Sequence, residues 1–348
     1  MLPAAILLAA ALAAGTADAD TTGNVIEQVD ALMADYAGNV PGASVLVVHD
    51  GKPVVRRSYG LADVEQGIAA SPATNYRLAS VTKQFTAAAI LLLAEDGKLE
   101  LDDPIGRWLP SLPPAPAAAT LHQLLNHTSG ILDYEDYVAE DAKVQVRDAD
   151  VLRLLEPHDR TQFAPGSEYR YSNSAYALLA LVVGKASGRG FPAYLRENIF
   201  LPLGMESTLA RVDEGPAVPH RAYGHSLVDG AWIRTDQSPT SAVLGDGGVY
   251  SSIDDLQRWD AALSDDRLFS AEVRRLAFTP HVATDVPGTG YGYGWRITNE
   301  SQWHSGETRG FRNVIVRWSA RGLTVVVLTN RDDPTPHALA LQIGALFP

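Results

Sequence analysis

Strand-forming sequence is concentrated near the two ends of this 348-residue chain. Two β-rich runs, 43–50 and 52–60, meet at Asp50-Gly51, a dipeptide typical of a tight hairpin. Near the other end, 292–298, 311–320 and 323–330 are predicted as three further strands, with a turn at Arg321-Gly322 and a helix from about Pro336. Strands at both ends restrict the fold, because they favour one sheet to which both ends contribute.

The sequence between these ends is mostly helical, from Arg77 to about Arg211. Apolar residues recur there with a spacing of 3.6 in segments that stop at Gly or Pro: 119–130, 148–157 and 174–188. We therefore expect an α+β fold, with an antiparallel sheet built from both termini, flanked by helices, and an inserted, mainly helical lobe. The predicted unit, 20–348, comprises an α/β lobe of 24–76 and 241–348 and a helical lobe of 77–240. The seam between two lobes is a common place for a site.

The first nineteen residues have the pattern of an export signal. An apolar run from Leu2 to Ala14 precedes an Ala17-Asp18-Ala19 step that resembles a signal-peptidase site. The alternative is a membrane anchor, but the run is shorter than the roughly 18 to 20 apolar residues that span a bilayer. We expect a secreted or periplasmic protein whose mature chain starts near Asp20 and has no stable membrane span.

Charge and composition exclude several classes of partner. The formal net charge is −13, so the chain lacks the basic surface that nucleic acid needs. It has no cysteine, which excludes disulfides, thiolate metal sites and a cysteine nucleophile. The nine histidines lack the i, i+4 spacing of a metal-binding helix. We expect no metal and no cofactor, and a small molecule or peptide as partner.

The segment 77–100 is predicted as a buried helix whose opening turn carries Ser80 and Lys83. Residues three apart lie on one helix face, so the amine can reach the hydroxyl. A serine becomes a strong nucleophile when a neighbouring base takes its proton, and a lysine is such a base when its surroundings lower its pKa. The backbone N–H of Ser80, at the start of the helix, would also stabilise an oxyanion. The alternative is a solvated first turn that Ser80 merely caps.

Two more motifs follow in order: Tyr171-Ser172-Asn173 before a predicted helix, and His304-Ser305-Gly306. With Ser80-Val81-Thr82-Lys83, the chain resembles the serine β-lactamase and penicillin-recognising peptidase superfamily. The similarity is to its class C-like branch, which contains class C β-lactamases, D-alanyl-D-alanine carboxypeptidases, D-aminopeptidases and related esterases. It covers roughly 42–330 and implies a β-lactamase/transpeptidase-like fold.

The resemblance also implies roles. Tyr171 would carry protons between Ser80 and the leaving group, and Asn173 would bind Lys83 or the acyl amide of the substrate. Gly306 would keep a strand edge bare for the substrate, and the N–H of Glu307 would complete the oxyanion hole. Ser305 belongs to the same substrate-binding motif.

His304 departs from the family pattern. It stands where many members have a lysine, and a histidine is only partly charged at neutral pH, so efficient β-lactam hydrolysis is not expected. Arg309 or Arg312 could supply the missing charge, although solvated arginines at a strand end are the simpler interpretation. Tyr134 could line the cleft entrance, and His127 is interpreted as structural.

These features predict an exported serine hydrolase that forms an acyl-enzyme through Ser80 and cleaves an ester or a D-amino-acid peptide, as carboxypeptidases and esterases do. One alternative is a class C-like β-lactamase, and another is a non-catalytic sensor that binds penicillin or peptidoglycan fragments. The sequence lacks the Gly-x-Ser-x-Gly elbow of an α/β-hydrolase and a complete nucleotide-binding motif. The substrate is thus expected to be an ester, a D-amino-acid peptide or a β-lactam, and the oligomeric state stays open.

Overall fold

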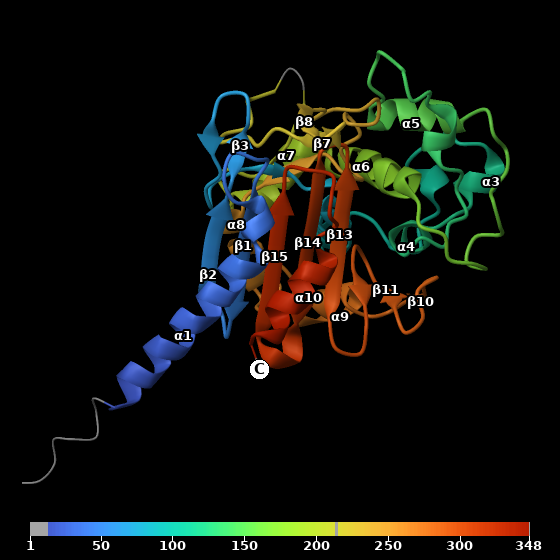
Figure 1. The fold of residues 1–348 in the computed structure, drawn as a ribbon. Helices are drawn as coiled ribbons and strands as arrows, with labels where there is room; N and C mark the ends of the chain where they lie inside the picture. The colour runs from blue at the N-terminus through green and yellow to red at the C-terminus, as the bar shows by residue number, and fades with distance from the viewer. Residues whose placement is uncertain (1–12, 213–214, 348) are drawn as a thin grey trace, which may run out of the picture.

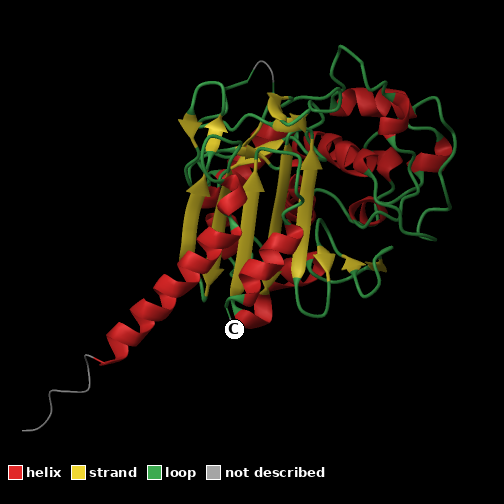
Figure 2. Ribbon diagram, viewed as in Figure 1, coloured by secondary structure: helices red, strands yellow, loops and turns green. Residues whose placement is uncertain are grey.

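A computed structural model describes residues 13–212 and 215–347. Its centre is an eight-stranded antiparallel sheet in the order β10-β11-β12-β13-β14-β15-β1-β2 (Figures 1 and 2). The five long strands are β1 Ala43–His49, β2 Lys52–Tyr59, β13 Gln302–Thr308, β14 Phe311–Trp318 and β15 Leu323–Thr329. Because β1 pairs with β15, both ends of the chain build one sheet, as the sequence predicts.

The hairpin between β1 and β2 turns at the predicted dipeptide. Asp50 and Gly51 both have left-handed backbone, with φ of 49° and 73°. Positive φ at both central residues is the signature of the type I′ turn, whose twist matches that of the flanking strands. The prediction of a two-residue hairpin here is confirmed.

The single strand predicted for 292–298 is wrong. The structure instead has two short strands, β11 Gly290–Tyr291 and β12 Arg296–Ile297, separated by a turn. Gly294 has a left-handed φ of 77°, and a Cβ there would lie 2.8 Å from the carbonyl oxygen of Lys83. The glycines thus end the strand and let this turn pack against the helix that carries the lysine.

Helices cover both faces of the sheet, and side chains alternate between the faces along β1. On one face, Val45 and Val47 join the apolar cluster beneath α1 Ala13–Leu32 and α10 His337–Ala345. On the other face, Leu46 and Val48 join the cluster around α2 Lys83–Glu95 and α8 Ile253–Ala262. Helix α2 is buried along most of its length, as its apolar sequence predicts.

A group of helices lies to one side of the sheet (Figure 1). It contains α3 Pro114–Ala117, α4 Leu121–Leu125, α5 Asp148–Leu155 and α6 Asn173–Ser187. Helix α7 Phe191–Leu195 packs against α6. Helix α6 packs against α2 and ends at Gly188, whose φ is 68°. The remaining elements are α9 Ala271–Ala277, β3 Leu61–Asp63, β4 Ile68–Ala69, β5 Tyr76–Arg77, β6 Leu209–Ala210, β7 His225–Val228, β8 Ala231–Arg234, β9 Val249–Ser251 and β10 Val282–Ala283.

The predicted export signal, 1–19, lies largely outside the described residues. Helix α1 begins at Ala13 and runs without a break through the predicted cleavage step. Within the described part of the chain, no helix combines the length and the apolar character needed to cross a membrane. Export and the cleavage site stay predictions.

Candidate active site

Ser80 lies on a tight 3-10 turn, Ala79–Thr82, that leads directly into α2. Its neighbours Ala79 and Val81 are buried, whereas Ser80 is partly exposed. Ala79 has a φ of 50°, a left-handed conformation that is unusual for a residue with a Cβ. Such strain persists only where the surroundings impose it, and here it presents the hydroxyl of the next residue to solvent.

The side chain of Lys83 is fully buried and makes three hydrogen bonds. Its Nζ donates to Ser80 Oγ at 3.1 Å, to Asn173 Oδ1 at 2.8 Å and to the backbone oxygen of Asp246 at 3.0 Å. An ammonium group has three donors, and these acceptors satisfy all of them. The amine thus connects the first predicted motif with the second.

Tyr171 stands beside this amine. Lys83 Nζ lies 4.8 Å from the centre of the Tyr171 ring, and among the described residues the buried Tyr171 hydroxyl has no hydrogen-bond partner. Asn173 begins α6, and Ser172 caps that helix by accepting a hydrogen bond from the N–H of Ala175 at 3.1 Å. The cap fixes the start of α6, from which Asn173 reaches the amine.

Strand β13 runs along the turn that carries Ser80. A Cβ on Gly306 would lie 2.0 Å from the carbonyl oxygen of Leu78 and 3.2 Å from the backbone nitrogen of Ser80. The glycine is therefore needed for the strand to approach the turn that carries Ser80. Beyond Trp303, β13 pairs with no strand of the described residues on the side of β12, so its remaining backbone forms an edge.

His304 points into the protein rather than into the opening. Its Nδ1 donates to the oxygen of Ser305 at 2.6 Å, so its Nε2 is free to accept from the Tyr291 hydroxyl at 2.9 Å. Burial, and then the charge of Lys83, lower the pKa of His304 to about 3. His304 is therefore neutral at physiological pH, and not partly charged as we expected. The third motif offers no cation.

A cavity of about 50 Å³ opens beside Ser80. Four residues predicted for the site line it, Ser80, Tyr134, Asn173 and Glu307, while Lys83, Tyr171, His304, Ser305 and Gly306 are not in its lining. Seven further residues complete the wall: Arg77, Ala79, Glu135, Thr240, Asp246, Gly247 and Thr308.

The two arginines proposed as replacements for the family lysine are placed elsewhere. Arg309 is exposed in the turn between β13 and β14 and does not line the cavity. Arg312 donates to the backbone oxygens of Thr308 at 2.6 Å and Phe311 at 2.9 Å. It therefore holds its own hairpin together.

Two carboxyl groups of the cavity were not predicted from the sequence. Asp246 accepts a hydrogen bond from the Tyr134 hydroxyl at 3.1 Å, and burial raises its pKa to about 7. Glu135 accepts from Asn173 Nδ2 at 3.3 Å, and burial, with the nearby charge of Asp133, raises its pKa to about 7. The only signals in the sequence are the glycine turn at Asp246 and the adjacency of Glu135 to Tyr134.

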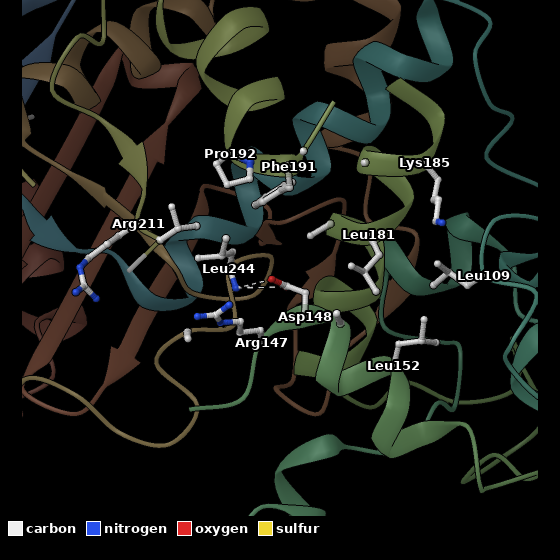
Figure 3. A pocket seen from close by; sticks show the side chains of 16 residues that line it. Leu109, Arg147, Asp148, Leu152, Leu181, Lys185, Phe191, Pro192, Arg211 and Leu244 are labelled. Carbon is white, nitrogen blue, oxygen red and sulfur yellow. Dashed lines mark hydrogen bonds between the residues drawn. The ribbon is translucent and has the colours of Figure 1, made fainter. Parts of the chain in front are cut away.

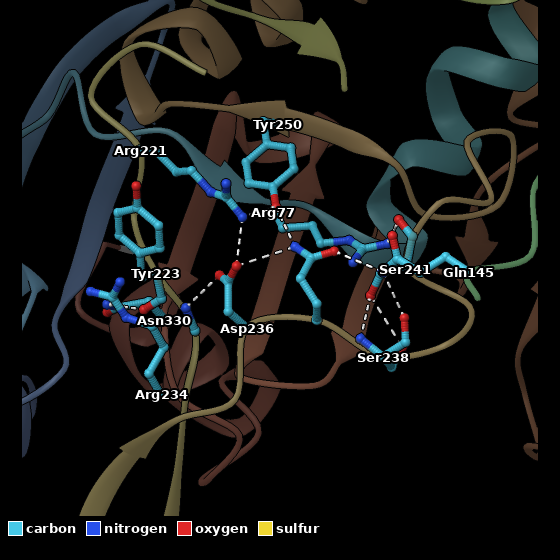
Figure 4. Close-up of polar contacts among 12 residues, drawn as sticks. Arg77, Gln145, Arg221, Tyr223, Arg234, Asp236, Ser238, Ser241, Tyr250 and Asn330 are labelled. Carbon is cyan, nitrogen blue, oxygen red and sulfur yellow. Dashed lines mark hydrogen bonds and ion pairs between the residues drawn. The ribbon is translucent and has the colours of Figure 1, made fainter. Parts of the chain in front are cut away.

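Helix α2 and the turn before it hold the segment 241–249, which carries Asp246. Thr86 donates to the oxygen of Gly245 at 2.7 Å, and Thr82 accepts from the N–H of Val249 at 3.2 Å. Just before Ser80, the buried Arg77 donates to the oxygen of Ser241 at 2.6 Å (Figure 4). Side chains on both sides of Ser80 thus fix one wall of the cavity.

A larger cavity, of about 660 Å³, borders the same segment (Figure 3). Its wall is mostly aliphatic and includes the buried Asp148 at the start of α5. The Asp148 carboxylate accepts from the N–H groups of Leu244 at 3.1 Å and Gly245 at 3.0 Å. Burial raises the pKa of Asp148 to about 6. Asp148 therefore anchors the segment 241–249 from the side of the helical lobe.

Comparison with known proteins agrees with this geometry. Residues 25–346 match the protein family described as Beta-lactamase. The chain is 30% identical over 321 residues to Penicillin-binding protein 4* of Bacillus subtilis (strain 168), covering 87% of this chain and 71% of that protein. It is 31% identical over 327 residues to a D-aminopeptidase of Gluconobacter oxydans (strain 621H), covering 91% of this chain but only 60% of that protein. Among solved structures, D-amino acid amidase from Ochrobactrum anthropi SV3, complexed with L-phenylalanine amide, matches with a TM-score of 0.80 and 25% identity, over 94% of this chain and 97% of the amidase.

Proposed function

The chain belongs to the beta-lactamase family, and from that premise we propose that it is a serine hydrolase that forms an acyl-enzyme through Ser80. The observation that carries the proposal is the position of the Lys83 amine, hydrogen-bonded both to the Ser80 hydroxyl and to Asn173. A buried base in contact with a partly exposed hydroxyl is the arrangement that activates a serine.

The proposed acylation starts from the neutral Lys83 amine, whose lone pair takes the proton of the Ser80 hydroxyl while Oγ attacks the substrate carbonyl carbon. The backbone N–H groups of Ser80 and Glu307 hold the oxyanion of the tetrahedral intermediate. The bond to the leaving group then breaks, and the leaving group takes a proton from the Tyr171 hydroxyl, which Lys83 reprotonates. Water releases the acyl group and restores Ser80. The closeness of the Tyr171 ring to the amine supports this route, as does the lack of another hydrogen-bond partner for its hydroxyl among the described residues.

The charges of the cavity favour a substrate with a free amine. Glu135, Asp246 and Glu307 line the cavity, whereas its one cationic side chain, Arg77, is buried and bonded to Ser241. A substrate carboxylate would meet no exposed cation in this lining. A D-amino-acid amide, or a peptide with a D-residue at its amino end, would place its ammonium group near Glu135.

The D-aminopeptidase and the D-amino acid amidase among the similar proteins support the same substrate class. The carboxypeptidase-like and β-lactamase-like alternatives are less favoured, because both require recognition of a carboxylate. His304 is neutral, and Arg312 is bonded to the backbone oxygen of Thr308, so neither offers a cation for a substrate carboxylate.

Two assays test the proposal. A fluorophosphonate probe should label the wild type on Ser80, and the label should disappear in Ser80→Ala but persist in Ser167→Ala, a matched change of an exposed serine. Hydrolysis of D-phenylalanine amide should then exceed that of a chromogenic cephalosporin. Label that survives Ser80→Ala would refute the acyl-enzyme, and rapid cephalosporin cleavage without amide cleavage would refute the substrate class.

A further inference from the structure

His127, at the C-terminal end of α4, contacts the backbone on both sides of Tyr171. The N–H of Arg170 donates to the His127 carbonyl oxygen at 3.0 Å, and the N–H of Ser172 donates to His127 Nδ1 at 3.1 Å. One residue thus binds both neighbours of the tyrosine in the sequence. We propose that His127 is a positioning residue that fixes the Tyr171 hydroxyl for proton transfer, an inference that rests on the proposed function.

The imidazole also packs on the ring it positions. The centres of the His127 and Tyr171 rings lie 4.3 Å apart at an angle of 37°. Tyr291 packs against the imidazole as well, at 4.5 Å and 66°, and its hydroxyl is bonded to His304. The Tyr171 ring is therefore held by backbone bonds beside it and by an aromatic contact on its face, which leaves little freedom to its hydroxyl.

His127 is itself held in place by its neighbours. It adopts a left-handed φ of 63°, and its N–H bonds to the oxygen of Leu124 at 3.3 Å. The next residue, Thr128, donates to Asn126 Oδ1 through its hydroxyl at 2.7 Å and accepts from the N–H of Gly166 at 2.8 Å. The turn after α4 is thus fixed before it binds the Tyr171 segment.

The hydrogen bond from the N–H of Ser172 to His127 Nδ1 requires a neutral imidazole. Because Nδ1 accepts the N–H of Ser172, the ring proton must sit on Nε2. Burial, followed by the charge of Lys83, keeps the pKa of His127 well below its usual value. The buried Nε2 has no partner among the described residues. The hydrogen bond at Nδ1 is therefore the one polar contact by which the His127 side chain holds the Tyr171 segment.

A mutational cycle separates positioning from general support of the fold. His127→Asn keeps an acceptor near the position of Nδ1 and tolerates left-handed backbone, whereas His127→Gly keeps the backbone but loses the acceptor and the ring. We expect His127→Gly to lower kcat for D-phenylalanine amide by about 30-fold with little change in KM, and His127→Asn to lower it by about threefold. In the Tyr171→Phe background, His127→Gly should have almost no further effect, because the group it positions is absent.

Three results would overturn the inference. One is a loss of kcat by His127→Gly that is as large in Tyr171→Phe as in the wild type. Another is equal impairment of His127→Asn and His127→Gly. The third is an unmoved Tyr171 ring in a crystal structure of His127→Gly. Far-UV circular dichroism checks that each variant folds. If His127→Gly does not fold, the same comparison with Tyr171→Phe is made with His127→Asn. Wild type that hydrolyses no substrate would refute the proposed function instead, and the crystal structure would still decide the positioning claim.

Discussion

At the scale of single residues, Lys83 connects parts of the chain that are far apart in sequence. Its three acceptors belong to the nucleophile turn, to the start of α6 and to the segment 241–249. Removing the amine therefore removes a base and leaves three groups without their common partner.

We expect Lys83→Met, which keeps much of the volume, to lower kcat by about a thousandfold, because general-base catalysis contributes factors of this order. Lys98→Met is the control, since Lys98 is exposed and pairs only with Asp96 at 3.1 Å. Steady-state hydrolysis of D-phenylalanine amide measures kcat of the two variants. A Lys83→Met variant with activity close to wild type would exclude the lysine as base.

In the proposed function, Glu135 binds the ammonium group of the substrate. We expect Glu135→Gln to raise KM for D-phenylalanine amide about fivefold, because a partly solvated ion pair contributes about 1 kcal/mol. N-acetyl-D-phenylalanine amide lacks the ammonium group, so its KM should not change. Equal effects on the two amides would show that Glu135 does not recognise the amine.

The contact at Gly306 gives a third expectation. A methyl group there would collide with the carbonyl oxygen of Leu78, so Gly306→Ala must move β13 away from the Ser80 turn. We expect kcat to fall by about a hundredfold and Tm by several degrees. Gly23→Ala, where the new Cβ meets no atom within 4 Å, should leave both values near wild type. An active Gly306→Ala variant would contradict the need for this close approach.

The residues of the site divide by how far the sequence can predict them. Ser80 and Lys83 are three residues apart, so helical geometry brings them together before any tertiary structure is known. Glu135 lies in a short 3-10 helix, Tyr134–Tyr137, and Asp246 lies in a turn. Only the packing of these segments around Asn173 and Tyr134 brings the two carboxyl groups to the cavity. No local pattern encodes that packing.

At the scale of elements, the segment 241–249 behaves as one wall of the site. The nucleophile helix holds it through Thr86, and α5 holds it through Asp148. The segment carries the backbone oxygen that accepts the third hydrogen bond of Lys83. The position of the Lys83 amine thus depends on hydrogen bonds made outside the cavity.

We therefore expect Thr86→Val to speed amide hydrogen exchange in 241–249 and to lower kcat about tenfold, since it leaves the buried oxygen of Gly245 without this donor. Thr279→Val, in which a half-buried threonine loses a comparable bond to the backbone oxygen of Arg275, is the control. Unchanged exchange in 241–249 would show that the segment is held by other contacts.

Elements with a two-residue period or a strong turn signal were predictable, and those broken by tertiary contacts were not. The β1–β2 hairpin follows from Asp50-Gly51 alone. The failure at 292–298 has a tertiary cause, because Gly294 bends the chain toward α2 and no local signal distinguishes that turn from a strand.

At the scale of the whole molecule, three acids with raised pKa values make stability depend on pH. The pKa of Asp148 is raised to about 6, and those of Glu135 and Asp246 to about 7. A carboxyl whose folded-state pKa is raised favours the folded state below its unfolded pKa, near 4, and loses this contribution as pH rises through the folded pKa. These three groups should lower the free energy of unfolding between pH 4 and pH 7.

Asp148→Asn mimics the protonated acid and removes one of these titrations. We expect the difference in unfolding free energy between pH 4.5 and pH 7.5 to be smaller in Asp148→Asn than in the wild type. Urea denaturation at the two pH values measures it, with Asp159→Asn, a change in a surface loop, as the control. Parallel changes in Asp148→Asn and the wild type would contradict the role of Asp148.

The order of strands has a consequence for biosynthesis. The Ser80 turn is translated well before β13, which supplies Gly306 and the proposed oxyanion donor. Strand β1 also waits for β15 before it gains its second neighbour. A nascent chain therefore lacks the complete candidate site until β13 and β15 have both been translated.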